Sequence, residues 1–124
     1  MNKCKINIWG RDFELPVNYD CFPGEDVLDS QVNALSLLIE SPTVIDESFN
    51  SVESYIFKNA PNEVVVSIDN IFKYVMPKSI FIPRSGEQIS IAIMCDYKFD
   101  PEHGLAVIFE SGKFKAVGEQ DVIL

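Results

Sequence analysis

Apolar and polar residues alternate near the N-terminus, which is the pattern of β-strands that bury one face. The segments 6–8 and 13–17 each alternate, and they lie on either side of Gly10 and Arg11. Two short alternating segments separated by a glycine turn predict a β-hairpin at this end of the chain.

The last third of the chain shows the same alternation over longer segments. Apolar residues occupy every second position from 89 to 99, and the segments 105–109 and 113–117 continue the pattern. Ser111 and Gly112 separate the last two segments, and a connection of two such residues is typical of tight hairpins. The sequence therefore predicts consecutive antiparallel hairpins here.

Between these strand regions the apolar spacing becomes i, i+4, i+7 and i+11, which is the repeat of one side of an α-helix. One stripe consists of Leu28, Val32, Leu35 and Ile39, and the next consists of Ile45, Phe49, Val52 and Ile56. Pro42 separates the two helices, since proline suits a first helical turn, and the second helix runs to about Lys58. A short third helix is predicted over 68–75, and a strand follows at 79–83.

The order of strands, helices and strands predicts an α+β fold in which two or three helices pack on one face of an antiparallel sheet. The 124 residues suit a single domain, 1–124, with an N-terminal hairpin, a helical middle and C-terminal hairpins. The other sheet face is also partly apolar, so we expect either that another segment covers it or that it is a contact surface. Its apolar residues are Ala92, Met94, Ala106 and Ile108.

Negative charge is concentrated in one stretch of the first half of the chain. The net charge is −9, and residues 12–57 carry ten carboxylates with no lysine or arginine. Surface helices usually mix charges, because Glu–Lys pairs four residues apart are mildly stabilising. The unmixed charge leaves two interpretations open, an ordinary solvated surface or a surface that binds a basic protein partner. The candidate binding residues on the two helices are Asp26, Asp29, Glu40, Asp46, Glu47 and Glu53.

The composition argues against several classes of partner. A chain with a pI near 4.4 is unsuited to nucleic acid or anionic membranes, whose phosphates require cationic contacts. No segment approaches the roughly 20 apolar residues of a membrane-spanning helix, and the N-terminus lacks the apolar segment of a signal peptide. Cys4, Cys21 and Cys95 have no CxxC spacing, which favours reduced thiols. We therefore expect a cytoplasmic protein.

The segment 96–103 is the main candidate for chemistry, because it contains the one histidine of the chain. An enzyme centred there would use Asp96, Asp100, Glu102 and His103, and the last three of these residues are the possible metal ligands. A solvated turn is the simpler interpretation, since a proline and a glycine follow Asp100 in the positions that turns require.

A catalytic pair of Cys95 and His103 is not expected. If Phe99 pairs with Gly104 across the hairpin, about 17 Å of strand separates the thiol from the imidazole, which is beyond hydrogen-bond reach. The chain also contains no phosphate-binding glycine loop, no serine-nucleophile motif and no zinc-protease motif. We therefore expect no catalytic residues, no cofactor and no enzymatic activity.

The segments 94–109 and 118–124 resemble a family of small, uncharacterised bacterial domains. The shared pattern is Cys-Asp-Tyr-x-Phe-Asp-x-Glu-His-Gly followed by a terminal Gln-Asp-x-x-Leu, and the segment 9–15 and the helix containing Gln31 are also similar. Such domains look similar to immunity proteins and accessory domains encoded near bacterial toxin genes. The resemblance implies binding and neutralisation without catalysis, and an acidic surface would suit a basic toxin such as a nuclease.

Three functional hypotheses follow from these observations. The first is a bacterial, non-enzymatic binding domain, with an immunity-type inhibitor as one form, whose helical carboxylates contact a basic protein. The second is a metal-assisted or hydrolytic enzyme centred on 96–103. The third is a homodimeric structural protein that associates through Ala92, Met94 and Ile108.

Overall fold

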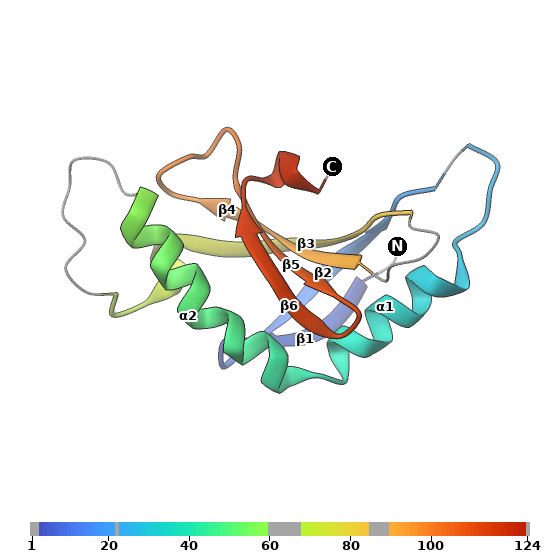
Figure 1. The fold of residues 1–124 in the computed structure, drawn as a ribbon, viewed down its shortest axis with the longest axis horizontal. Coiled ribbons are helices and arrows are strands. Elements are labelled where there is room, and N and C mark those ends of the chain that lie inside the picture. Colours follow the sequence, from blue (N-terminus) through green and yellow to red (C-terminus); the bar gives the residue numbers. More distant parts are fainter. Residues whose placement is uncertain (1–2, 22, 60–67, 85–89, 124) are drawn as a thin grey trace.

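In the part of the chain that the structure describes, one six-stranded sheet and two α-helices make up the fold (Figure 1). The computed structural model describes residues 3–21, 23–59, 68–84 and 90–123. Two 3-10 turns, η1 and η2, complete the elements, and the predicted α+β class is confirmed. The elements are β1 (Lys3–Ile8), β2 (Arg11–Tyr19), α1 (Asp29–Ile39), α2 (Pro42–Asn59), η1 (Ile71–Lys73), β3 (Val75–Ile82), β4 (Ser90–Tyr97), β5 (Leu105–Glu110), β6 (Lys113–Gly118) and η2 (Gln120–Val122).

The predicted hairpins are present, and two of them have turns of the same conformation. Trp9 and Gly10 have φ angles of 51° and 85°, and Ser111 and Gly112 have φ angles of 52° and 78°. Two successive positive φ angles define the type I′ turn, whose twist matches that of antiparallel strands. The first turn therefore falls on Trp9 and Gly10, one residue earlier than predicted, and the Trp9 indole N–H donates to Ser48 Oγ of α2 at 3.0 Å.

The sheet is not wholly antiparallel, because β2 and β3 run parallel. Val17 pairs with Ile80 in this register, and Tyr19 pairs with Ile82. Parallel neighbours need a long connection, and the segment that contains α1 and α2 provides it. Apolar periodicity reports the buried face of a strand and not its partner, so the sequence did not indicate this pair.

The predicted third helix is reduced to the three residues of η1, and β3 begins already at Val75. The strand continues through Pro77, where the pairing with β4 shifts register between Pro77 and Ser79. Such an irregularity accommodates a proline, which cannot donate a backbone hydrogen bond to the ladder. In the following strand, Ile89 lies outside the described residues, and β4 spans Ser90–Tyr97.

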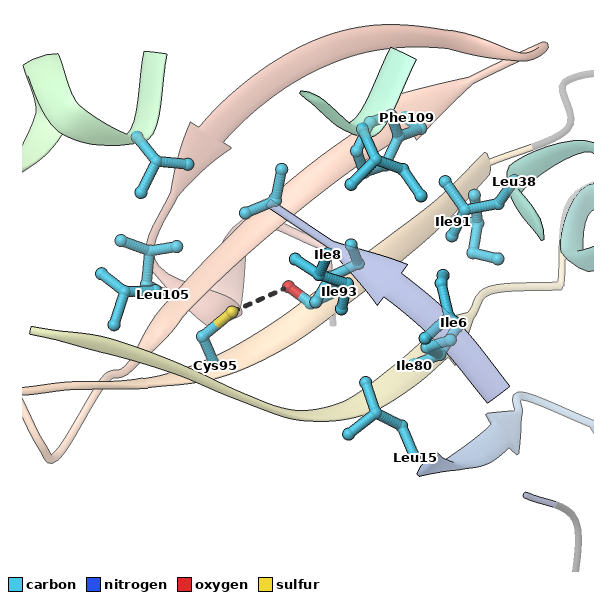
Figure 2. Close-up of a cluster of buried hydrophobic side chains, with 14 of the residues drawn as sticks. Ile6, Ile8, Leu15, Leu38, Ile80, Ile91, Ile93, Cys95, Leu105 and Phe109 are labelled. Atoms are coloured by element: carbon cyan, nitrogen blue, oxygen red, sulfur yellow. Dashed lines mark hydrogen bonds between the residues drawn. The ribbon is translucent and has the colours of Figure 1, made fainter. Parts of the chain in front are cut away.

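The main core is formed by alternate side chains of the central strands together with both helices (Figure 2). The predicted stripe of α2 is confirmed, since Ile45, Val52 and Ile56 are at most 1% exposed and Phe49 is half-buried. From the sheet, Ile93 and Leu105 are fully buried in the same cluster. Complete burial of a large aliphatic side chain such as these stabilises the folded state by about 1.5–3 kcal/mol.

The predicted stripe of α1 is wrong at two of its four positions, because Val32 and Ile39 are 47% and 40% exposed, whereas Leu35 packs against the core. The buried side of this helix instead contains Gln31, Ala34 and Leu38. The Gln31 amide N–H₂ donates to the carbonyl oxygens of Asp20 at 2.9 Å and Ile82 at 3.1 Å, and its oxygen accepts from the Leu28 N–H at 2.9 Å. A buried amide is stable when its hydrogen bonds are satisfied, so these contacts fix the orientation of the helix.

The second sheet face is covered within the chain. Ala92, Met94, Ala106 and Ile108 are at most 7% exposed, and Phe81 and Ile123 pack against them. Ile123 follows η2, so the C-terminal segment is part of this cover. Of the two alternatives expected for this face, cover by another segment of the chain is the one observed. Among the described residues, no helix is both long and apolar enough to cross a membrane.

Candidate functional site

The six carboxylates proposed for partner binding lie on the outside of the molecule. Five are exposed and Glu53 is half-buried. Within the residues that the structure describes, none of the six has an ion-pair partner, whereas the neighbouring Glu25 pairs with Arg84 at 2.6 Å. Asp26 does not lie on a helix as predicted, because α1 begins at Asp29, and Glu40 is the C-cap of that helix. We call all six the helical acid set: Asp26, Asp29, Glu40, Asp46, Glu47 and Glu53.

Exposed apolar side chains accompany the acids on α1. Six large apolar residues are exposed in the described ranges, and four of them lie in α1 or directly before it. These four are Val27, Val32, Leu37 and Ile39, at 36–47% exposure. By helical geometry Val32 and Ile39 lie on one flank of the strip formed by Asp29 and Glu40, and Leu37 lies on the other flank. The apolar repeat of the sequence does not reveal this surface, because it places Val32 and Ile39 in the core.

The segment 96–103 forms the predicted turn at the β4–β5 connection. The Gly104 N–H donates to the Asp100 carbonyl at 2.9 Å, and the His103 N–H donates to Asp100 Oδ1 at 3.2 Å. His103 Nδ1 also lies 3.0 and 3.1 Å from the two carboxylate oxygens of Asp100. This hydrogen bond lowers the pKa of Asp100 and raises the pKa of His103.

The acid that joins this pair is Glu119 and not Glu102. One ligand atom from each of Asp100, His103 and Glu119 lies within 4.8 Å of the other two, a grouping that we call the loop cluster. Glu119 directly precedes η2, and the Gln120 N–H donates to the His103 carbonyl at 3.2 Å. Its position depends on the return of the C-terminal segment, so spacing within 96–103 could not reveal it.

Gly104 and Gln120 connect the two segments of the resemblance pattern. Gly104 has a φ angle of 64°, and a Cβ atom there would lie 2.5 Å from Gln120 Nε2 and 2.9 Å from the Cys95 carbonyl oxygen. The missing side chain leaves room for Gln120 Nε2 to donate to that carbonyl at 3.0 Å. The Cys, Gly and Gln of the pattern therefore form one packing unit, which holds the C-terminal segment on the loop.

Cys95 and His103 cannot act together as nucleophile and base. Cys95 is fully buried, its thiol donates to the Ile93 carbonyl at 3.7 Å (Figure 2), and burial raises its pKa. The His103 side chain is 43% exposed. The assumed pairing of Phe99 with Gly104, which would place Cys95 opposite Ile108, is wrong. Cys95 pairs with Leu105, because the β4–β5 connection contains more residues than that pairing allows. All three cysteines are free thiols.

Two tyrosines lie beside the loop cluster. Tyr97 is 2% exposed, and its hydroxyl has no hydrogen-bond partner in the described part of the chain. Burial, with smaller effects from Tyr55 and Asp100, raises the pKa of Tyr97 to about 12. The Tyr55 ring is 5.7 Å from the Tyr97 ring, and its pKa is raised by burial and then by the charges of Glu119 and Asp100.

The residues assigned to a homodimer contact are not free in the single chain. Ala92, Met94 and Ile108 are 0%, 7% and 5% exposed, as part of the covered sheet face. Association through them would require the C-terminal segment with Ile123 to move away.

Comparison with known families assigns this chain to one of them. Residues 1–124 match the family described as "Domain of unknown function (DUF6985)", and the chain belongs to that family. No curated protein and no solved structure matches the chain.

Proposed function

We propose that this domain is a non-enzymatic binding module that recognises a basic protein through the outer surface of α1 and α2. The observation that carries the proposal is the presence on α1 of exposed apolar side chains beside carboxylates that have no ion-pair partner among the described residues. Val32 and Ile39 are 47% and 40% exposed beside Asp29 and Glu40. Protein interfaces combine apolar anchors with a polar rim, and this surface has both.

We infer that both helices cover the same face of the sheet, so that their outer sides form one surface. Leu38 of α1 and Val52 of α2 belong to one buried cluster, together with Val107 of β5. The helical acid set would then extend along both helices toward a single partner. Since the set contains six negative charges, it would attract a basic protein over about one Debye length, roughly 8 Å at physiological salt.

The two kinds of side chain would contribute different parts of the binding. The apolar residues would supply affinity by leaving water, at about 25 cal/mol per Å² buried. The carboxylates would mainly accelerate association and select partners of opposite charge, as complementary charges do at other interfaces. Binding should therefore weaken with salt.

Immunity-type inhibition is the narrower form of this proposal. It is supported by the resemblance of the segments 94–109 and 118–124 to domains similar to immunity proteins. The partner would then be a basic toxin, and the complex would suppress its activity.

The proposal is tested by capturing partners from the native host with three tagged versions of the chain. The versions are the wild type, the triple variant Asp29→Lys, Glu40→Lys, Glu47→Lys, and the control Glu14→Lys, Asp69→Lys, Asp121→Lys. All six positions are exposed, and the two variants change the net charge equally. We expect a basic protein to be retained at low salt by the wild type and the control, and lost from the helical variant. Equal retention by all three versions would refute the proposed surface.

A further inference from the structure

We propose that the loop cluster of Asp100, His103 and Glu119 binds a divalent transition-metal ion of the zinc type, and that this ion fastens the C-terminal segment to the β4–β5 connection. One ligand atom of each residue already lies within 4.8 Å of the other two. The three residues come from two segments that lie side by side in the fold (Figure 1). The proposal is independent of the acidic surface on the helices.

The donor set suits a zinc-type ion better than calcium or magnesium. One imidazole nitrogen and two carboxylates are common ligands of zinc, while calcium and magnesium prefer oxygen alone. Ligand atoms around tetrahedral zinc lie about 3.5 Å apart, since each is about 2.0–2.2 Å from the ion. The side chains of His103 and Asp100 are 43% and 32% exposed, so rotations at the surface can bring the ligand atoms together.

The backbone around the cluster is held in place before any ion binds. Gln120 makes two hydrogen bonds across the two segments, to the carbonyls of His103 at 3.2 Å and Cys95 at 3.0 Å. The second bond requires the absence of a side chain at Gly104. Asp100 is fixed by the turn, in which its carbonyl accepts from the Gly104 N–H at 2.9 Å. Ligands on a preorganised backbone lose less entropy when they bind a metal.

A second observation points to a ligand at this place. The hydroxyl of Tyr97 is buried and has no hydrogen-bond partner among the described residues, although buried hydroxyls are usually satisfied. The Tyr97 carbonyl accepts from the Asp100 N–H at 3.2 Å, and the charge of Asp100 is one of the causes that raise the pKa of the Tyr97 phenol, so this side chain is near the cluster. A hydrated ion between the carboxylates would bring polar groups to this side of the core.

Metal binding would stabilise the cover of the second sheet face. Glu119 lies four residues before Ile123, which packs against Ala92 and Ile108. An ion that holds Glu119 to the loop therefore also holds this cover in place. Since the three ligands come together only in the folded chain, the ion should bind the folded state selectively and raise the melting temperature.

The test is a titration of the metal-free chain with zinc chloride, followed by calorimetry and thermal unfolding. We expect one ion per chain, a higher melting temperature with zinc, and no such rise with calcium. Glu119→Gln and His103→Ala should each weaken zinc binding at least tenfold, because each variant removes a ligand. The matched control is Glu102→Gln, whose carboxylate is exposed and outside the cluster, and it should bind within twofold of the wild type.

Circular dichroism of each variant without metal keeps the result interpretable, since only variants with the wild-type spectrum are compared. If Glu119→Gln does not fold, Glu119→Asp replaces it, and this shorter carboxylate should weaken binding without abolishing it. No zinc binding below millimolar concentration would overturn the proposal. Equal losses in Glu102→Gln and Glu119→Gln would also overturn it, because they would indicate non-specific attraction to the loop.

Discussion

Gly104 shows how one residue explains a part of the sequence pattern that had no physical meaning by itself. Its positive φ angle and the close approach of Gln120 both require a residue without a side chain. The turn at Asp100 and His103 could be predicted from its residue types. The contribution of Glu119 could not, because it depends on contacts between segments that are distant in the sequence.

We expect Gly104→Ala to lower the free energy of unfolding by about 2–4 kcal/mol, because the methyl group adds a steric clash to the cost of the left-handed backbone. The matched control is Gly24→Ala, since Gly24 also has a positive φ of 82° but has open space around it. That variant should lose only about 1–2 kcal/mol. Urea denaturation of both variants measures the difference. Equal losses in the free energy of unfolding would mean that the Gln120 side chain moves aside to accommodate the methyl group.

Tyr97 should make stability depend on alkaline pH. Its pKa is about 12 in the folded chain and about 10 when unfolded, so folding favours the protonated phenol. The resulting contribution is complete below pH 10 and is lost as the pH rises through 12. Tyr97→Phe should remove this part of the pH dependence. At pH 8 the variant should be within about 1 kcal/mol of the wild type, because the hydroxyl that it loses has no partner in the described residues.

Urea denaturation of both proteins from pH 8 to pH 11 measures this effect. The stability of the wild type should fall more steeply above pH 10 than that of Tyr97→Phe. Parallel curves would contradict the assignment of a raised pKa to Tyr97.

At the level of the elements, the two helices differ in how well their sequence predicts their orientation. The buried side of α2 follows the apolar repeat, so Ile45, Val52 and Ile56 were identified correctly. The apolar repeat of α1 predicts two buried positions wrongly, because Gln31, with its hydrogen bonds satisfied, takes a core position. Val32 and Ile39 consequently face outward. Patterns of apolar residues cannot show a polar side chain whose partners come from other elements.

We expect Gln31→Ala to lower the free energy of unfolding by about 2–4 kcal/mol. The variant removes the donor to the Asp20 carbonyl and the acceptor of the Leu28 N–H, and it leaves the Ile82 carbonyl with the Asp20 N–H as its remaining donor. Asn33→Ala is the matched control, because Asn33 is exposed on the same helix, and its effect should stay within about 0.5 kcal/mol. Thermal and urea unfolding check both values. A small loss for Gln31→Ala would show that packing alone orients α1.

At the scale of the whole molecule, charge is distributed unevenly over a well-packed core. The acids concentrated in 12–57 were evident from the sequence, and five of the six in the helical acid set are exposed. The accompanying apolar surface was not evident, since it results from the orientation of α1. The parallel pairing of β2 with β3 was missed for a related reason, because strand partners are set by the path of the whole chain.

The association rate of the captured partner, measured by stopped-flow fluorescence between 50 and 300 mM salt, tests the central claim most directly. For the wild type and for the control Glu14→Lys, Asp69→Lys, Asp121→Lys, we predict a fall of about tenfold or more over this range. For Asp29→Lys, Glu40→Lys, Glu47→Lys, we predict slow association that depends little on salt. Salt-independent association of the wild type, or equal rates for both triple variants, would contradict recognition through the helical acid set.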